Sequence, residues 1–500
     1  MKLKSLLLIS ILFYAPIQNV SAQKWESDLV KFSSAGKLNY TPNAKGDIIP
    51  DFSRVGYYQG GREIPQVKVV KALSANGQND QQQIQAAIDE LAKLPLDAKG
   101  FRGAILLKSG TYEIPGSIYI NASGIVLRGE GLATKLIATG TGQRKLISVN
   151  GAGKPKELLN TRAKITDAYV PVGAKSFKVA NAANFKVGDD IIVYRPATTK
   201  WIQDLKMDQI EARSGTVQWK PEDYHLNFER KITAIKGNEI FIDNPIVMAM
   251  ETQYGGGEIY KYTFEGRINE VGIEDLLLES AYETDTDENH AWDAVWMNRV
   301  ENAWVSHVTS KYFGFSCVNL AGYSKQVTVR NCSSLAPKSK IEGGRRYTFN
   351  NDGQLNLVRD CKADEGRHDY VTGAKVAGPN VFYNCVATNA KADIGPHHRW
   401  AVGTLYDNVV TDGEINVQDR GNWGTGHGWA GVTQVLWNCT AKKVTVQNPY
   451  VSGNNYAIGV SAIKADGRLK DRPDGIWEGF NKKGIMIPSL YIKQLEDRRK

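Results

Sequence analysis

The chain has 500 residues, of which 42% are hydrophobic and 23% charged, with a formal net charge of +9 at pH 7. This length is enough for a large core or for more than one domain. The positive excess suits an acidic partner such as a polyanionic glycan, and ordinary solubility explains it equally well. No Lys/Arg tract or combined aromatic and basic motif is present, which argues against nucleic acid as a partner.

Residues 1–22 have the pattern of a secretory signal peptide. Lys2 and Lys4 precede an apolar run over residues 6–14, and small residues offer a cleavage site after Ala22. The run is too short to anchor the chain in a membrane, and no later segment is apolar for long enough to span one. We therefore expect an exported protein, secreted or periplasmic, that has no membrane anchor and is a monomer.

A helix and a series of short strands follow. The stretch "NDQQQIQAAIDELAKL" at 79–94 places apolar residues on one face of an amphipathic helix. Strand-like phrases come directly after it, among them "GAILLKSGTYEI" and "GIVLRGEG". A helix that closes the open end of a β-solenoid explains this order, because an uncapped end would expose strand edges and core.

Residues 155–265 differ in pattern from both flanks. The phrase "ITDAYVPVGAKSFKVANAANFKVGDDIIVYRPA" alternates apolar and polar residues between Gly-Asp turns, and "ERKITAIKGNEIFIDNPI" contains a hairpin-like turn. We interpret this part as an inserted β subdomain, which either walls one side of a groove or stabilises the N-terminal coils.

Further along, a short phrase recurs that ends in Asn or Asp followed by Cys. It reads "VRNCSS", "VRDCKA", "FYNCVA" and "LWNCTA". "LYDNVV" is the same phrase with Asn408 in the place of the cysteine, and "VSHVTS" is a looser copy at His307. From His307 to Cys439 the steps are 25, 29, 24, 23 and 31 residues. A period in the twenties with one short β-branched or aromatic run per turn indicates a parallel β-helix.

In such a solenoid, equivalent residues of successive coils lie above one another. Asn and Asp residues should form a polar ladder at one corner, and the neighbouring cysteines should be small buried fillers. The cysteine spacings lack a C-x-x-C knuckle, so we reject a cysteine metal site. The expected ladder is Asn331, Asp360, Asn384, Asp407 and Asn438, beside Cys332, Cys361, Cys385 and Cys439.

The opening "ANGQNDQQQIQAAIDE", with "GAILLKSGTYEI" and "IVLRGEG" after it, resembles the start of right-handed β-helix proteins of the pectate-lyase superfamily. The likeness covers roughly residues 70–140 and the coils over 268–447. It implies an all-β, right-handed parallel β-helix and a secreted carbohydrate-active enzyme. We divide the chain into a signal peptide, first coils with the capping helix, β insertion, main coils with the active site, and C-terminal cap, at 1–22, 23–154, 155–265, 266–447 and 448–500.

Basic residues and histidines repeat with the spacing of the coils. Arg346, His368, His398 and Arg420 are separated by 22, 30 and 22 residues, so their side chains should share one face, about 5 Å apart per coil. Arginine pairs with carboxylate or sulfate, and aromatic rings pack against sugar rings. The competing interpretation is a row of ordinary surface charges. The expected substrate-binding residues are Arg345, Arg346, Arg367, His397, Trp400, Arg420, Trp423 and His290.

A basic and aromatic wall suits an acidic polysaccharide substrate, and its residues suit a lyase that acts by β-elimination. A lyase needs a base, an acid, and a group that neutralises the carboxylate next to the abstracted proton. The candidate catalytic residues are His398 as base, Arg399 with Arg346 and Arg420 for the carboxylate, Tyr370 or His427 as acid, and His368 as substitute for base or acid.

Two other classes of function stay open. A glycoside hydrolase needs two carboxyls that flank the scissile bond. The phrase "GHG" at 426–428 resembles part of the polygalacturonase pattern, but that family's Asp-Asp and Asn-Thr-Asp phrases have no counterpart in the coils. A non-catalytic glycan-binding solenoid would keep the arginines and aromatics and would have no need of histidines.

The acidic stretch "ETDTDENHAWD" at 283–293 offers oxygen ligands, and Asp285, Asp287 and Asp293 are candidates to hold Ca²⁺. Its spacing is not that of an EF-hand, and a solvated loop is the competing interpretation. We expect no required cofactor and keep Ca²⁺ as an alternative.

Overall fold

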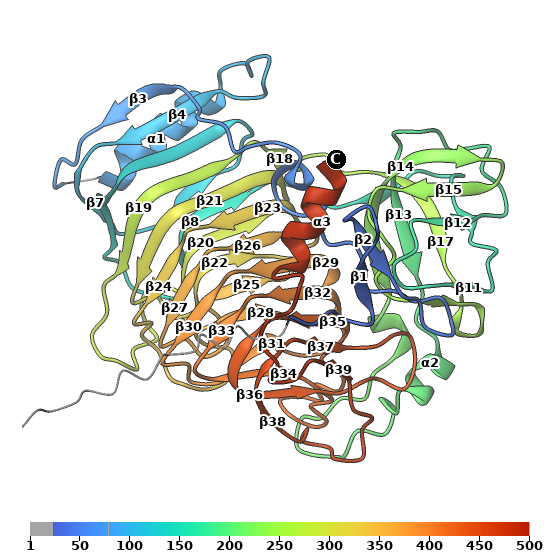
Figure 1. Cartoon of the computed structure of the whole chain (residues 1–500). Helices are drawn as coiled ribbons and strands as arrows, with labels where there is room; N and C mark the ends of the chain where they lie inside the picture. The colour runs from blue at the N-terminus through green and yellow to red at the C-terminus, as the bar shows by residue number, and fades with distance from the viewer. Residues whose placement is uncertain (1–23, 79, 500) are drawn as a thin grey trace, which may run out of the picture.

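The fold is an all-β, right-handed parallel β-helix (Figure 1). The computed structural model describes residues 24–78 and 80–499, and the expected signal peptide at 1–22 lies outside the described residues. Each complete coil passes through three parallel sheets, which we call faces 1, 2 and 3 in chain order. Long strands bend from face 1 into face 2 in three coils: β7 (Ile125–Ala138), β19 (Gly272–Ser280) and β21 (Val300–Lys311).

The other strands of the solenoid are short, and each pairs in parallel with the strand one coil away. Face 1 adds β3 (Val69–Leu73), β4 (Gly103–Leu107), β23 (Ser324–Arg330), β26 (Leu357–Arg359), β29 (Ala377–Tyr383), β32 (Ala401–Asp407), β35 (Gly431–Trp437), β37 (Tyr456–Ile458) and β39 (Ile476–Glu478). Face 2 adds β5 (Gly110–Ile114), β24 (Ser333–Leu335), β27 (Lys362–Asp364), β30 (Val386–Thr388), β33 (Val410–Thr411) and β38 (Ser461–Lys464). Face 3 comprises β6 (Ile118–Ile120), β8 (Lys145–Asn150), β20 (Asp293–Asn298), β22 (Ser316–Leu320), β25 (Phe349–Asn351), β28 (Tyr370–Thr372), β31 (Asp393–Pro396) and β34 (Glu414–Val417). Two further strands are β18 (Ile268–Asn269), beside β21, and β36 (Thr440–Val446), which runs from face 2 into face 3.

Helix α1 (Asp80–Ala92) covers the open end of the first coils, as the sequence predicts. It packs on β5 and β6. Its apolar stripe is continuous with the solenoid core, because Ile84, Ala87, Ile88 and Leu91 are buried among inward residues of the coils. The helix thereby shields core that a bare solenoid end would expose.

A ladder of Asn and Asp marks the corner between faces 1 and 2. Its members have left-handed backbones, with φ of 52° at Asn331, 54° at Asp360, 50° at Asn384 and 52° at Asn438. Asn and Asp adopt this conformation more readily than other residues with a side chain. Amide groups also bond along the ladder, since Asn384 Nδ2 donates to Asp360 Oδ1 at 2.6 Å. The recurring phrase therefore encodes a repeated sharp corner.

Asp407, the fourth expected member, is not in the ladder. It ends β32, in register with Tyr383 and Trp437, and the corner with φ of 55° falls on Asn408. The Asp407 carboxylate is buried and accepts hydrogen bonds from Ser489 Oγ at 2.8 Å and from the backbone N–H of Tyr491 at 2.7 Å. Burial raises the pKa of Asp407 to about 7.

The cysteines occupy equivalent places on successive coils. The carbonyls of three of them each accept a hydrogen bond from a backbone N–H one coil later. The donors to Cys332, Cys361 and Cys385 are Lys362, Val386 and Val410, at 2.9, 3.0 and 2.9 Å. All five cysteines are free and buried. Val409 fills the corresponding place in the coil that lacks a cysteine. The thiols are apolar fillers, as the sequence predicts.

An antiparallel sheet stands between β8 and β18 in the chain. It packs on the outer side of face 1, where Trp400 and Trp429 join its core. Its strands are β9 (Lys156–Glu157), β10 (Ala163–Lys164), β12 (Ser176–Lys178), β13 (Asp190–Arg195), β14 (Leu226–Lys236), β15 (Glu239–Ile242) and β17 (Glu258–Thr263). The same part of the chain contains a separate antiparallel pair, β11 (Tyr169–Val170) with β16 (Met250–Glu251), and helix α2 (Thr199–Asp204).

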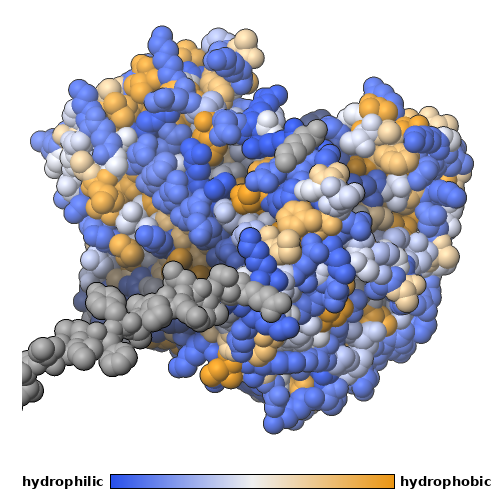
Figure 2. All heavy atoms as spheres, in the orientation of Figure 1, coloured by the Kyte–Doolittle hydropathy of each residue, from blue (hydrophilic) through white to orange (hydrophobic). Residues whose placement is uncertain are grey.

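The coils continue beyond residue 447, because β37 pairs with β35 and β39 with β37. The two ends of the described chain meet on face 1. Helix α3 (Leu490–Arg499), with β1 (Val30–Phe32) and β2 (Leu38–Tyr40), covers its outer side (Figure 1). Figure 2 shows a largely hydrophilic surface, notched between the first coils and the inserted sheet. No helix in the described part of the chain is long and apolar enough to cross a membrane.

We predict that Asn384→Val lowers thermal stability more than Asn384→Gly does. Both variants lose the amide that bonds along the ladder, but only valine is forced into a left-handed backbone, which costs a residue with a Cβ about 1–2 kcal/mol. Differential scanning calorimetry of the two variants measures the difference. Equal unfolding midpoints would show that the corner does not require the left-handed conformation.

Candidate functional site

Four histidines from three successive coils lie ring against ring beside face 3. His368 precedes β28, His397 and His398 follow β31, and His427 comes after β34. The ring centroids of His368 and His397 are 4.5 Å apart, and those of His397 and His398, and of each with His427, are 5.0 Å apart. We call these four residues the histidine cluster.

Hydrogen bonds orient the rings of the cluster. The Nδ1 atoms of His397 and His398 are 2.9 Å apart, and His397 Nε2 lies 3.1 Å from the Tyr347 hydroxyl. His368 Nδ1 donates to the Asp393 carbonyl oxygen at 2.8 Å. A neutral His368 ring therefore carries its proton on Nδ1, which leaves Nε2 with a free lone pair. That atom is buried and has no hydrogen-bond partner among the described residues.

Burial keeps the cluster neutral. Desolvation lowers the pKa of His368 to about 4 and that of His398 to about 4, and nearby arginines add to the effect. The pKa of His427 falls to about 3 for the same reason, and the pKa of His397 is also strongly lowered. At neutral pH all four rings are thus uncharged, which is the form that can accept a proton.

Arginines and one carboxylate surround the cluster. Arg420 is buried and forms an ion pair with Asp393. Burial favours a raised pKa for Asp393, but Arg420 and His368 outweigh it and hold the pKa below its usual value. Arg399 is half-buried and donates to the Thr425 carbonyl at 3.0 Å. It stands at the edge of the cluster with a guanidinium that no carboxylate of the described residues neutralises.

Other expected binding residues have partners within the protein. Arg345 forms an ion pair with Glu288 at 2.7 Å, and the buried Arg346 donates to the Ser339 carbonyl at 2.6 Å. The half-buried Arg367 donates to a backbone carbonyl. Trp423 is half-buried, with the Arg420 guanidinium 5.7 Å from its ring centre. Of this group, Arg346 is a structural residue, which corrects its assignment to substrate binding.

Tyr370 is not a candidate acid, which is a second correction. It is completely buried in the solenoid core, and its hydroxyl donates to the carbonyls of Cys361 and Val386 at 2.9 and 2.8 Å. The ring stacks on Phe349, with centroids 5.5 Å apart. A substrate outside the coils cannot reach this hydroxyl.

Trp400 and His290 also belong to the interior. Trp400 is completely buried under the inserted sheet and donates to Met248 Sδ at 3.2 Å. The His290 ring is buried, with Nδ1 2.8 Å from Ser280 Oγ and Nε2 2.9 Å from the Lys338 carbonyl. Neither side chain is available to a substrate, so both assignments to binding are wrong.

The three carboxylates considered for Ca²⁺ have separate surroundings. Asp285 is exposed and pairs with Lys338 at 2.7 Å, and Asp287 caps its own loop by accepting backbone N–H groups. Asp293 accepts from Ser316 Oγ at 2.8 Å on β20. Among the described residues, no group of three or more His, Cys, Asp or Glu side chains is arranged to hold a metal ion.

Face 3 carries a network of polar side chains that was not predicted from the sequence. Asn319 donates to Asp293 at 3.0 Å and accepts from Asn350 at 3.0 Å, and Asn350 also lies 2.9 Å from Asp352. Burial raises the pKa of Asp293 to about 6 and raises that of Asp352 as well. Its members are single polar residues on separate strands, and their positions in the sequence do not repeat with a recognisable spacing. Only the stacking of the coils brings them together.

A cavity of about 250 Å³ adjoins this network, where the inserted sheet meets the coils. Asp352, Lys375 and Tyr323 line its coil side, and Tyr260 and His225 line its insertion side. The backbone N–H of Lys375 donates to the Arg399 carbonyl at 2.8 Å, so the cavity is next to the edge of the histidine cluster.

Neither a protein-family model nor a curated protein matches the sequence. Among solved structures, an alginate lyase from Paenibacillus sp. str. FPU-7 is 11% identical over 83% of this chain and 100% of its own, with a TM-score of 0.38. The tailspike protein of E. coli bacteriophage HK620, in complex with a pentasaccharide, is 9% identical over 87% and 61% of the two chains, with a TM-score of 0.40. An iota-carrageenase from A. fortis is 9% identical over 80% and 59%, with a TM-score of 0.33. Membership of the pectate-lyase superfamily stays a prediction, and the chemistry is assigned from the residues of this chain.

We predict that His368 makes stability depend on pH. The unfolded ring takes up a proton near pH 6.5, whereas the folded ring stays neutral down to about 4. Its contribution is therefore present above about pH 6.5 and is lost as the pH falls from there towards 4. Relative to His368→Gln, the wild type should lose about 1–2 kcal/mol between about pH 6.5 and 5.

Calorimetry of both proteins across this range tests the prediction. The comparison with the variant is needed because Asp293 and Asp407, whose pKa values are raised to about 6 and 7, titrate with the opposite sign. A stability difference between wild type and variant that does not change with pH would show that the ring is not held neutral.

Proposed function

We propose that this protein is an exported polysaccharide lyase that cleaves a uronate-containing polysaccharide by β-elimination at the histidine cluster. The observation that carries the proposal is the cluster itself, in which four neutral imidazoles lie beside the unneutralised guanidinium of Arg399. β-Elimination needs a neutral base next to a cation that stabilises the substrate carboxylate, and this arrangement offers both.

The hydrogen bonds of the cluster favour His398 as the base. If its Nδ1–H donates to His397 Nδ1, then His397 Nε2–H donates to the Tyr347 oxygen, and both ring protons have an acceptor. His398 Nε2 then carries the lone pair. The ring is half-buried beside the coils rather than inside them, so a sugar can approach it.

The elimination balances with these residues. His398 Nε2 takes the proton from the carbon next to the uronate carboxylate, while Arg399 stabilises the negative charge that develops on that carboxylate. The electron pair forms the new carbon–carbon double bond, and the bond to the glycosidic oxygen at the neighbouring carbon breaks. The His398 imidazolium has a low pKa and returns the proton to the leaving oxygen, with His427 beside it.

A hydrolase is the second candidate, because the network on face 3 contains two carboxyls with raised pKa values, Asp293 and Asp352. Hydrolysis requires two carboxyls, a protonated one as acid and an ionised one as base or nucleophile. The products separate the two reactions. A lyase yields new reducing ends together with the ultraviolet absorbance of an unsaturated uronate, and a hydrolase yields reducing ends alone.

We predict that His398→Ala lowers kcat on the best acidic polysaccharide by about 10²–10⁴-fold while binding persists, because a general base is lost. Tyr370→Phe is the matched control, since its buried hydroxyl should affect stability and leave kcat near that of the wild type. A panel of pectin, alginate and glycosaminoglycans assayed by ultraviolet absorbance and reducing ends provides both measurements.

Several outcomes would contradict this proposal. Near-normal turnover by His398→Ala removes the base assignment. Reducing ends without absorbance, lost in Asp293→Asn and Asp352→Asn, point to the hydrolase. Binding across the panel without any product points to a non-catalytic glycan-binding protein. Loss of activity with a calcium chelator, restored by Ca²⁺, would show that Ca²⁺ and not Arg399 stabilises the substrate carboxylate.

The pH profile gives a separate prediction. Because burial lowers the pKa of His398 to about 4, the base stays unprotonated in weakly acidic solution. The acid limb of kcat/KM, which reports the free enzyme, should therefore lie near pH 4 and not near 6.5, the value of an unperturbed histidine. An acid limb at about pH 6.5 in the wild type would contradict this prediction and would show that the catalytic imidazole is solvated.

A further inference from the structure

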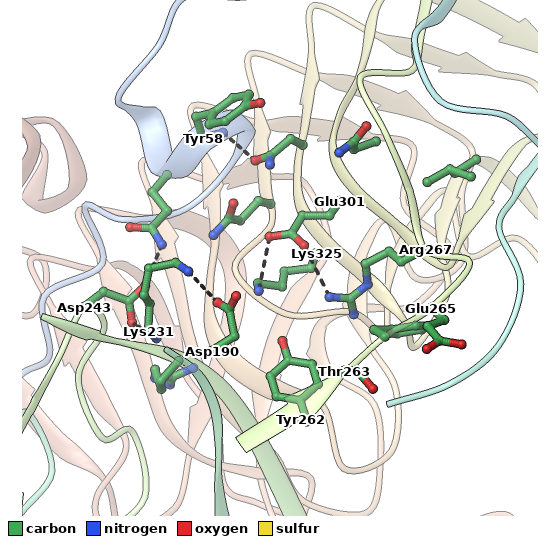
Figure 3. Close-up of a pocket in the computed structure, with 17 residues that line it drawn as sticks. Tyr58, Asp190, Lys231, Asp243, Tyr262, Thr263, Glu265, Arg267, Glu301 and Lys325 are labelled. Carbon is green, nitrogen blue, oxygen red and sulfur yellow. Dashed lines mark hydrogen bonds and ion pairs between the residues drawn. The ribbon is translucent and has the colours of Figure 1, made fainter. Parts of the chain in front are cut away.

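A second, larger cavity lies away from the histidine cluster, between the inserted sheet and the early coils (Figure 3). Its volume is about 580 Å³, within the range of about 300–1,000 Å³ that is typical of small-molecule sites. Three separate parts of the chain line it. Tyr58 comes from the N-terminal segment, Tyr262 from β17 of the inserted sheet, and Glu301 from β21 of the coils.

The floor of the cavity is a network of compensated charges. Lys325 Nζ lies 3.1 Å from Glu229 and 3.2 Å from Glu301, and Arg267 bonds Glu229 through two nitrogens at 2.6 and 2.7 Å. Tyr262 donates its hydroxyl proton to Glu229 at 2.6 Å. The side chains of Glu229, Arg267 and Lys325 are no more than 7% exposed, so their geometry is fixed before any ligand arrives.

The rim is also charge-balanced. Asp190 on β13 pairs with Lys231 on the neighbouring strand β14 at 2.7 Å, as Figure 3 shows. Asp243 accepts from Gln59 Nε2 at 2.6 Å and from the backbone N–H of Lys231 at 2.9 Å. Four basic and four acidic side chains line the cavity in total. Asp190 and Lys231, and Glu301 with Arg267 and Lys325, are already in ion pairs, so at these groups an anionic ligand would have to displace a carboxylate and a cationic ligand an arginine or a lysine.

The N-terminal side of the cavity is held in an unfavourable backbone conformation. Tyr58 and Gln59 are consecutive left-handed residues, with φ of 45° and 55°. Contacts impose it, because Tyr58 N–H donates to Asn302 Oδ1 at 3.1 Å, its hydroxyl bonds Glu270, and Gln59 holds Asp243. Strain of this kind concentrates at ligand sites, and here it fixes two polar side chains at the edge of the cavity.

We propose that this cavity binds an uncharged sugar unit, as a non-catalytic glycan site separate from the histidine cluster. Sugar hydroxyls both donate and accept hydrogen bonds, and the cavity offers the acceptor Glu301, which is 28% exposed, together with the side-chain amides of Asn269, Asn302 and Gln326 in its lining. Because the charges cancel, a neutral ligand gains these bonds without breaking an ion pair. The site complements the histidine cluster, whose positive charge comes from Arg399, so a glycan with acidic units for the cluster and neutral units for the cavity suits the molecule.

Glu301→Gln tests the proposal. It removes an acceptor charge at the floor and leaves Arg267 and Lys325 with less compensation. Glu258→Gln is the matched control. Glu258 lies on β17, is exposed to a similar extent (25%), forms an ion pair with Arg162 and does not line the cavity. Calorimetric titration of the full-length protein with uncharged gluco-, galacto- and manno-oligosaccharides, and with oligogalacturonate as the acidic counterpart, supplies the affinities.

We expect at least one uncharged oligosaccharide to bind wild type, Glu258→Gln and His398→Ala alike, with affinity at least tenfold weaker in Glu301→Gln. Thermal unfolding of the two glutamate variants checks that both are folded. No binding of any uncharged sugar, or binding that Glu301→Gln leaves unchanged, would overturn the proposal, as would preferential binding of oligogalacturonate that depends on Glu301. Lyase activity on acidic glycans is read separately, so either proposal can fail alone.

Discussion

Parallel hydrogen bonding from one coil to the next is the constraint on which the rest of the molecule depends. It fixes register, since β28 and β31 pair Val371 with Gly395 and Thr372 with Pro396. A slip of one residue would turn core residues such as Ile394 outward, and this penalty recurs on every coil. Residues some 20–30 positions apart in sequence therefore meet reproducibly, and the histidine cluster is one result of this stacking.

The same constraint explains how much of the fold could be predicted. A corner that must be left-handed selects Asn or Asp, and the place after it must be small and apolar, so the phrase ending in Asn-Cys repeats visibly. The phrase "LYDNVV" offered two Asx residues, and the choice of Asp407 was wrong because it put Asn408 in the buried place. Val409 is the residue that fits among apolar neighbours, so the requirement for an apolar filler would have assigned the corner to Asn408.

The candidate site was less predictable, because local turns decide which way a side chain points. His368 and Tyr370 are two residues apart, yet only Tyr370 enters the core, since β28 begins at Tyr370 and alternation does not extend to the turn before it. Arg399 and Trp400 both have left-handed backbones, with φ of 51° and 68°, and the indole ends under the inserted sheet. The spacing in the sequence predicts where these residues lie on the solenoid, but it does not predict whether their side chains point into the core or outward.

The larger cavity and the histidine cluster differ in how they accommodate charge. At the cavity floor each cation lies between carboxylates, which is the way proteins tolerate buried charge. In the cluster, four imidazoles that packed ring against ring as cations would repel one another, and burial would penalise each of them. Neutrality is the condition for that packing, and it leaves Arg399 as the positive centre that an incoming anion meets.

That neutrality has a consequence for the proposed mechanism. A low pKa makes the free His398 a weak base, with its burial and the neighbouring Arg399 and Arg420 as causes. A substrate carboxylate that pairs with Arg399 neutralises one of these cations and brings a negative charge near the ring, and both effects raise the pKa of His398. The base should thus gain strength when the acidic sugar is in place. An uncharged sugar at the same position would not supply this charge, so selectivity for uronates would arise in the chemical step as well as in binding.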